Sequence, residues 1–253
     1  MGGGEKIRPV FLLGGYDLEM TTIRDLLLVH GYRVEDRRLE WGARLSAYAD
    51  ILNNTDTFAG IELIEDIPLP DHYIAIDHHN LNSGKPSSLE QVANLTGVSL
   101  NRYQQLVAAN DCGYIPALQN AGASPQEIDE IRKADRKAQG VTEEDEILAQ
   151  RSIETRLTKA GNLIVIESLT PKFSCITDRL FPFNRLLIGF ENHFVYYGEG
   201  AQELIETYNA LIAEKKAYYG GTGNGFFGLD KNSFDAFEAG KLKQEIIQKM
   251  SQS

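Results

Sequence analysis

The stretch Tyr73-Ile-Ala-Ile-Asp77-His78-His79-Asn80 decides the fold class. Its four apolar residues fit a buried strand, and they run directly into one carboxylate and two imidazoles. Open α/β sheets bind their ligands at the carboxyl ends of the strands, and these donors suit Mn²⁺, Mg²⁺ or Zn²⁺. A surface turn with unrelated histidines is the alternative, but three of the five histidines in the chain lie between residues 72 and 79. The stretch therefore predicts a metal site at the edge of a sheet.

Apolar runs alternate with amphipathic stretches along the first half of the chain. Strands are expected at 9–15, 57–61 and 73–76, and helices at 21–30, 87–95 and 101–109. Thr21 or Thr22 is expected to cap the first helix, and Ser87-Ser-Leu-Glu90 has the pattern of a capping box. Such alternation is typical of a parallel sheet with helices on its faces. We therefore predict an N-terminal, Rossmann-like α/β domain over residues 1–123.

The sequence changes in character after residue 123. Residues 124–158 are polar and charge-rich, and Ser124-Pro125 suits the start of a helix, so we interpret this region as a helical linker. Beyond it, strands are expected at 162–167, 186–190 and 194–197, and helices at 172–180, 201–214 and 233–250. Residues 159–253 are therefore predicted to form a second, smaller α/β domain.

Further carboxylates follow other predicted elements of the first domain. Asp17 and Glu19 stand after the first strand, where an extended backbone would point them to opposite sides, toward two metal ions or toward a metal ion and a water. Asp111 stands where the helix at 101–109 is expected to end. Each also has a structural interpretation, because acids at a helix start stabilise its dipole and an Asn-Asp pair favours a turn. These acids support a metal site only when they are considered together with the histidines.

Taken together, these motifs resemble those of the DHH phosphoesterase superfamily. The resemblance rests on Asp77-His78-His79 after a strand, the Asp17 and Glu19 pair, the Ser-Ser-x-Glu helix start and the later Asp111. The superfamily includes manganese-dependent inorganic pyrophosphatases, RecJ-type exonucleases, and oligoribonucleases and cyclic-dinucleotide phosphodiesterases. The resemblance implies a DHH domain over residues 1–123 and a DHHA1-like substrate-binding domain over residues 159–253.

The resemblance also implies a set of functional residues. The metal ligands would be Asp17, Glu19, Glu62, Asp77, His78 and Asp111, and the catalytic residues would be His79 and Asp77. In this scheme His79 is the donor or acid on the substrate side. The site would hold two Mn²⁺ or Mg²⁺ ions, which lower the pKa of a bridging water and polarise the phosphoryl oxygens for in-line attack.

Two departures from the superfamily pattern bear on this site. The family usually has Asp at the position of Glu19 and His at the position of Leu13, so one ion would lack an imidazole ligand, bind more weakly or be absent. The family also has an Asp at the end of the strand that precedes the histidines. The candidates in this chain are Glu62, Glu65 and Asp66. We favour Glu62, because it directly follows the expected strand.

A glycine-rich segment, Gly220-Gly-Thr-Gly-Asn-Gly-Phe-Phe-Gly228, lies where DHHA1 domains carry Gly-Gly-Gly-His-x-x-Ala-Ala-Gly. Three of its glycines match that pattern, while Thr222 and Gly223 replace the third Gly and the His. Glycines let backbone N–H groups approach a phosphate closely. The resemblance thus implies substrate binding by Gly220, Gly221, Gly223, Asn224 and Gly225. A glycine-rich turn between two elements is the alternative.

Composition limits the partners of the protein. Of 253 residues, 25 are Lys or Arg and 36 are Asp or Glu, so the formal charge is 25 − 36 = −11. Such a charge repels the backbone of long nucleic acids, so we expect no long nucleic acid as a stable partner. The apolar runs are far shorter than the ~20 residues that span a bilayer, and Cys112 and Cys175 form no disulfide pattern. We expect a cytoplasmic protein without membrane contact, and leave a homodimer open.

Cations that could complete a phosphate site are Lys85, Arg102, Arg132, Arg136 and Arg185, among which the sequence does not choose. The basic residues of 132–137 are interleaved with acids, so we expect them on a solvated helix face. The favoured hypothesis is a phosphoesterase for a small phosphorylated substrate or a short cyclic or linear oligonucleotide. A nucleotide sensor with weakened catalysis is the alternative. A processive exonuclease would require a long basic groove and a steep salt dependence.

Overall fold

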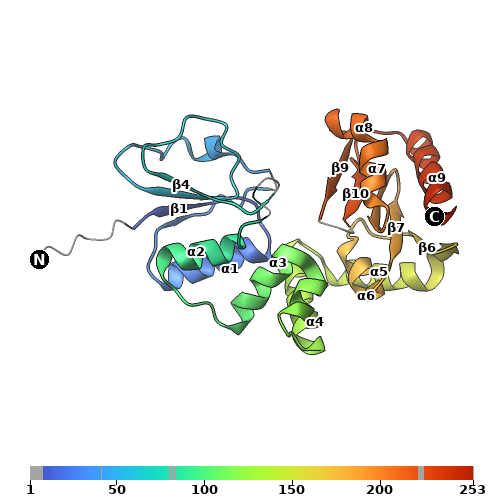
Figure 1. Ribbon diagram of the computed structural model, residues 1–253, viewed down its shortest axis with the longest axis horizontal. Coiled ribbons are helices and arrows are strands. Elements are labelled where there is room, and N and C mark those ends of the chain that lie inside the picture. The colour runs from blue at the N-terminus through green and yellow to red at the C-terminus, as the bar shows by residue number, and fades with distance from the viewer. Residues whose placement is uncertain (1–7, 41, 80–81, 83, 222–224, 253) are drawn as a thin grey trace, which may run out of the picture. The chain divides into compact units, whose positions relative to one another are not determined.

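The computed structural model describes residues 8–40, 42–79, 82, 84–221 and 225–252. It divides the chain into two compact units, Met1–Gly140 and Val141–Ser253 (Figure 1). Both units combine helices with a sheet, as predicted. Within the described ranges, no helix has both the length and the apolar character required to cross a membrane.

The first unit contains a four-stranded sheet in which every pair of neighbours is parallel. Its strands are β1 (Val10–Leu13), β2 (Val34–Glu35), β3 (Phe58–Ile61) and β4 (Tyr73–Ile76). The prediction was right for β1, β3 and β4 but missed β2, which has only two residues. In the order β2-β1-β3-β4, the chain adds β2 on one side of β1 and then adds β3 and β4 on the other side, so the order of strand addition reverses between β1 and β3. This is the topological switch point at which parallel α/β sheets bind their ligands.

Helices and loops cover both faces of this sheet. The helices are α1 (Leu18–Val29), α2 (Ser88–Thr96), α3 (Arg102–Asn120) and α4 (Pro125–Ala138). Because side chains alternate along a strand, Phe11 and Leu13 of β1 pack in the core beneath these helices. Val10 and Leu12 point the other way, into a smaller core with Tyr48 of the 3₁₀ helix η1 (Leu45–Tyr48). Both faces of β1 are therefore buried.

Two helix boundaries differ from the prediction. Helix α1 begins earlier than expected, because Asp17, rather than Thr21 or Thr22, is its N-cap and accepts a 2.8 Å hydrogen bond from the N–H of Met20. Helix α3 continues past 109, with a kink at Gly113 and Tyr114, where the backbone is not helical. The capping box at Ser87 is confirmed.

The second unit contains a six-stranded mixed sheet of order β5-β6-β7-β8-β10-β9. Its strands are β5 (Leu157–Ala160), β6 (Leu163–Glu167), β7 (Arg185–Phe190), β8 (His193–Gly198), β9 (Ala217–Gly220) and β10 (Phe226–Leu229). Its helices are α5 (Glu143–Arg156), α6 (Ser174–Leu180), α7 (Ala201–Thr207), α8 (Asn209–Ala213) and α9 (Ala236–Gln252). The predicted hairpin of β7 and β8 is confirmed, whereas β5, β9 and β10 were missed. The helix expected at 201–214 is two helices.

The region predicted as a linker, residues 124–158, divides between the two units. Helix α4 follows its predicted Ser124 cap and buries Ile131 in the core of the first unit. Helix α5 buries Ala149 in a core of the second unit, together with Ile166 of β6. Both helices thus contribute apolar residues to a core.

Gly14 lies where β1 leads toward Asp17, and a side chain there has no room. A Cβ atom would lie 2.4 Å from the carbonyl oxygen of Ile61 and 2.6 Å from that of Glu62. Gly14→Ala should therefore force β1 and β3 apart and lower the free energy of unfolding by about 1–3 kcal/mol, as measured by chemical denaturation. Gly84→Ala is the control, because no described atom lies within 4 Å of its added Cβ. Equal stability of the two variants would contradict the expectation.

Candidate metal centre

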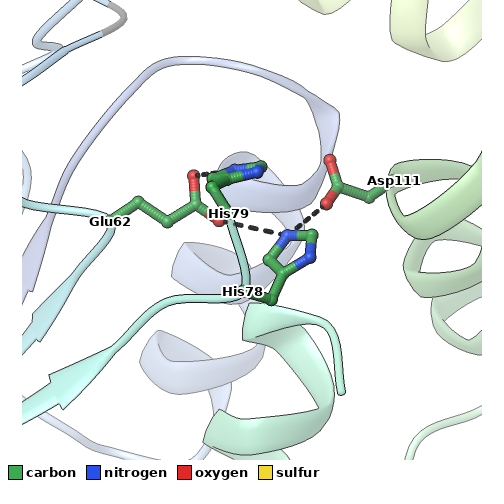
Figure 2. A group of neighbouring side chains, drawn as sticks. All are labelled: Glu62, His78, His79 and Asp111. Carbon is green, nitrogen blue, oxygen red and sulfur yellow. Dashed lines mark ion pairs between the residues drawn. The ribbon is translucent and has the colours of Figure 1, made fainter. Parts of the chain in front are cut away.

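Four side chains meet beyond the carboxyl ends of β3 and β4. Glu62 directly follows β3, His78 and His79 follow β4, and Asp111 comes from α3. One potential ligand atom from each residue lies within 4.8 Å of the others (Figure 2). The donors are two carboxylates and two imidazoles, a combination that divalent metal ions accept.

His78 lies at the centre of this group, and its side chain is 7% exposed. Its Nε2 lies 2.6 Å from Oδ2 of Asp111, 3.6 Å from Oε1 of Glu62 and 3.6 Å from Oε2 of Glu19. Nevertheless, Nε2 of His78, Oδ2 of Asp111 and Oε2 of Glu19 are buried without a partner in hydrogen-bond geometry among the described residues. Converging, unsatisfied donor atoms of this kind fit a divalent ion.

Glu62 has an unusual backbone conformation, with φ at 52° in the left-handed region. This conformation is unfavourable for a residue with a side chain, so other contacts must hold it. The Glu62 N–H donates to the carbonyl oxygen of Ile76 at 2.8 Å. The carboxylate accepts a 2.7 Å hydrogen bond from the hydroxyl of Ser88 and lies 3.3 Å from Nε2 of His79.

Asp17 and Glu19 place two further carboxylates beside this group. Oε1 of Glu19 accepts a 3.0 Å hydrogen bond from the N–H of Leu89, which leaves Oε2 directed toward His78. One oxygen of Asp17 caps α1, so this residue has the structural role of an N-cap, and its role as a metal ligand remains a prediction. Both acids lie near enough to Glu62 and Asp111 to feel their charge.

The crowding of acids shifts the protonation of the metal-free centre. Burial raises the pKa of Asp17 to about 7, and the charges of Glu62 and Asp111 add to this effect. Burial likewise raises the pKa of Glu19 well above its usual range. Burial opposes a charge on His78, but contacts with Asp111, Cys112 and Glu19 outweigh it and raise the pKa of His78 to about 12. Protons thus replace part of the positive charge that this centre requires.

Asp111 lies within α3 rather than after it, just before the kink. Arg132 of α4 braces this segment, since its guanidinium donates to Oδ1 of Asn110 at 2.9 Å and lies 4.5 Å from the ring centre of Tyr114. It also donates to Asp135 at 2.7 Å. Arg132 and Arg136 are buried, so the expectation of a solvated face was wrong for both. Asp135 on the same helix pairs with the Arg132 charge, whereas Asn110 and Tyr114 of the neighbouring helix α3 cover it, and the pattern of one helix alone could not reveal that cover.

Comparisons with known proteins agree with this architecture. No protein-family model matches the sequence, and no curated protein matches it. Among solved structures, PggH, a pGpG-specific phosphodiesterase from Vibrio, is similar to this chain with a TM-score of 0.50 and 13% sequence identity. The alignment includes 96% of this chain and 98% of the PggH chain. The chain has the fold of the DHH superfamily. The resemblance stated from the sequence is thereby confirmed for the fold.

Two further structures are more distant from this chain. RecJ from Thermus thermophilus, solved in complex with Mn²⁺, has a TM-score of 0.47 at 11% identity and covers 98% of this chain and 53% of its own. An uncharacterized protein from Helicobacter pylori has a TM-score of 0.29 at 9% identity, with coverage of 95% and 98%.

The DHH fold brings most of the predicted site residues together, but not all of them. Of the three candidates for the second motif, it places Glu62 in the centre, while Asp66 bonds to Ser46 and Glu65 is exposed. The carboxylate of Asp77 accepts instead from the N–H of His79 at 2.9 Å and from Asn82 at 2.8 Å. It lies outside the group of four and orders the loop that carries the histidines.

Leu13 stands where the DHH pattern has a histidine, and its side chain is buried in the apolar core of the first unit. No imidazole reaches the centre from this position. Ser88 was missed as a contact of the site. Its signal in the sequence was the second serine of the capping box, which follows the N-cap and is fully buried.

The glycine-rich segment joins β9 to β10 in an antiparallel hairpin. Packing accounts for two of its glycines. A Cβ on Gly220 would collide with the ring of Phe226, and one on Gly225 would lie 2.3 Å from the carbonyl oxygen of Gly220. Gly221 has a φ of 78°. Gly223 and Asn224 lie outside the described residues, and substrate binding by this segment remains a prediction.

The cations proposed from the sequence have structural partners in several cases. Arg102 forms an ion pair with Glu127, and Arg185 donates to the carbonyl oxygen of Met250 at 2.8 Å. The first contact joins the start of α3 to the start of α4, and the second joins the start of β7 to the end of α9.

The raised pKa of Asp17 predicts how pH changes the stability of the metal-free protein. Folded Asp17 keeps its proton up to about pH 7, whereas the unfolded chain loses it near pH 4, so stability falls as pH rises through this window. Asp17→Asn keeps a good N-cap and removes the titration. In EDTA, it should match the wild type at pH 4 and exceed it at pH 8, by an amount on the order of a few kcal/mol.

Denaturation at pH 4, 6 and 8 measures this difference. Glu65→Gln is the matched control, since Glu65 is exposed and should leave the pH profile unchanged. Parallel profiles for Asp17→Asn and the wild type would contradict the burial of a protonated Asp17.

Proposed function

We propose that the protein is a metal-dependent phosphoesterase. The convergence of Glu62, His78, His79 and Asp111 beyond the carboxyl ends of β3 and β4 carries this proposal. Unsatisfied, buried ligand atoms in that group fit a divalent ion better than they fit an ion pair within the protein. The DHH fold is compatible with this activity, and one protein among the similar structures is a pGpG-specific phosphodiesterase.

The proposed cofactor is Mn²⁺ or Mg²⁺, with two ions per site. Glu19, Glu62, His78 and Asp111 would hold the first ion, and Asp17 would contribute to the second. Bound metal ions lower the pKa of a coordinated water and polarise phosphoryl oxygens. Carboxylates supply the negative charge that balances such ions. Because Leu13 replaces an imidazole, we expect the two ions to bind with different affinities.

The two histidines would have different roles. His78 is nearly buried among carboxylates, which suits a metal ligand. The side chain of His79 is 30% exposed and contacts Glu62, so it is the histidine that a substrate can reach. We assign to His79 the donation of a proton or hydrogen bond to the substrate. Asp77 would fix the loop beneath it through its bond to the His79 N–H.

The proposed substrate is a small phosphorylated compound or a short oligonucleotide, cyclic or linear. A formal charge of −11 provides little attraction for a long strand, whereas a metal-loaded centre attracts phosphate locally. The glycine-rich hairpin of the second unit would contribute backbone N–H groups to the substrate through the residues predicted above.

The test is hydrolysis of pyrophosphate, linear and cyclic dinucleotides, short oligonucleotides and an aryl phosphodiester, with Mn²⁺ or with EDTA. We expect Mn²⁺-dependent turnover of at least one phosphodiester, and a loss of at least ~100-fold in kcat/KM for His78→Ala and for Asp111→Asn, because each removes a metal ligand. Asp66→Asn is the control, since Asp66 bonds to Ser46 outside the centre.

Three outcomes distinguish the hypotheses. Absence of turnover on every substrate would contradict the proposal. Tight nucleotide binding with one ion or none and no turnover would favour the sensor. A steep salt dependence on long single strands would favour the exonuclease.

A further inference from the structure

The first turn of α2 contacts three different parts of the candidate metal centre. The Ser88 hydroxyl donates to Oε1 of Glu62 at 2.7 Å, and the Leu89 N–H donates to Oε1 of Glu19 at 3.0 Å. The Gln91 amide donates to the carbonyl oxygen of Asp77 at 3.2 Å, just before the histidines. One helical turn thus fixes side chains and backbone that follow β1, β3 and β4.

Of these three contacts, the Ser88 hydroxyl has the most specific consequence. Glu62 has an unfavourable left-handed backbone, so the contacts around this residue must hold it in place. Among the described residues, Ser88 is its hydrogen-bond donor outside the group of potential metal ligands. Ser88 is fully buried, so water does not compete for this hydrogen bond.

We propose that Ser88 is a positioning residue of the metal centre, which orients the Glu62 carboxylate toward the ion through its hydroxyl. The hydrogen bond occupies one lone pair of Oε1 and leaves the second lone pair of Oε1 and both lone pairs of Oε2 available to the metal. Partners of this kind fix the rotamer of a ligand before the metal arrives, and their loss typically weakens metal binding by about 10–100-fold. The inference rests on the proposed metal-dependent function.

Ser87 and Ser88 form a natural pair for the test. Ser87 is the N-cap of α2, and its side chain accepts from the Glu90 N–H rather than contacting a glutamate of the centre. Ser87→Ala should therefore lower the melting temperature by about 2–4 °C without changing metal affinity by more than about twofold. Ser88→Ala keeps the cap and places a good helix former in the first turn, so the helix should persist.

The experiment is titration of the full-length, metal-free protein with Mn²⁺, followed by calorimetry or by the electron paramagnetic resonance signal of free Mn²⁺. Circular dichroism checks the fold of each variant. Ser88→Ala is expected to raise the Kd for Mn²⁺ by about 10-fold or more. Ser88→Thr retains the hydroxyl and is expected to restore the Kd to within about threefold of the wild type.

Each remaining outcome has one meaning. A wild-type protein that binds no Mn²⁺ would refute the proposed function itself. Wild-type affinity in Ser88→Ala would overturn the role of Ser88 alone. An equal loss of affinity in Ser87→Ala would also overturn it, because helix stability rather than the hydroxyl would then govern the site. A folded Ser88→Thr protein with the affinity of the Ala variant would do the same.

Discussion

The repulsion among buried carboxylates is the constraint on which the rest of the structure depends. Glu19, Glu62 and Asp111 all lie near Nε2 of His78, in a setting where like charges are costly. The metal-free protein lowers this cost by retaining protons. A divalent ion would replace them with a fixed positive charge, so metal binding would also raise the folding stability.

The architecture brings these acids together through elements far apart in the sequence. The order of the parallel sheet aligns the ends of β1, β3 and β4, and helix α3 adds Asp111 from the side. Neighbouring elements hold several of the candidate ligands in place. The cap of α1 fixes Asp17, the first turn of α2 fixes two glutamates, and Arg132 braces the kink beside Asp111. Preorganisation of this kind is what a metal centre requires.

Local patterns in the sequence predicted the parts that depend on local physics. The apolar runs of β1, β3 and β4 and the caps of α2 and α4 follow from periodicity and side-chain chemistry, and so does the position of Glu62 after a strand. Contacts between distant segments could not be predicted in this way. Three features depend on neighbours that no local pattern specifies. They are the hydrogen bond between the Asp77 carboxylate and Asn82, the burial of Arg132, and the kink at Tyr114. Strands β9 and β10 were missed because glycines weaken the strand signal.

The boundary at Gly140 has a consequence for how this protein evolves. Every residue of the group Glu62, His78, His79 and Asp111 belongs to the first unit, whereas the glycine-rich hairpin belongs to the second. Under the proposed function, mutations in the hairpin would alter ligand preference while the candidate metal ligands stay unchanged. A lineage of this protein would then reach new substrates without first losing the proposed cofactor.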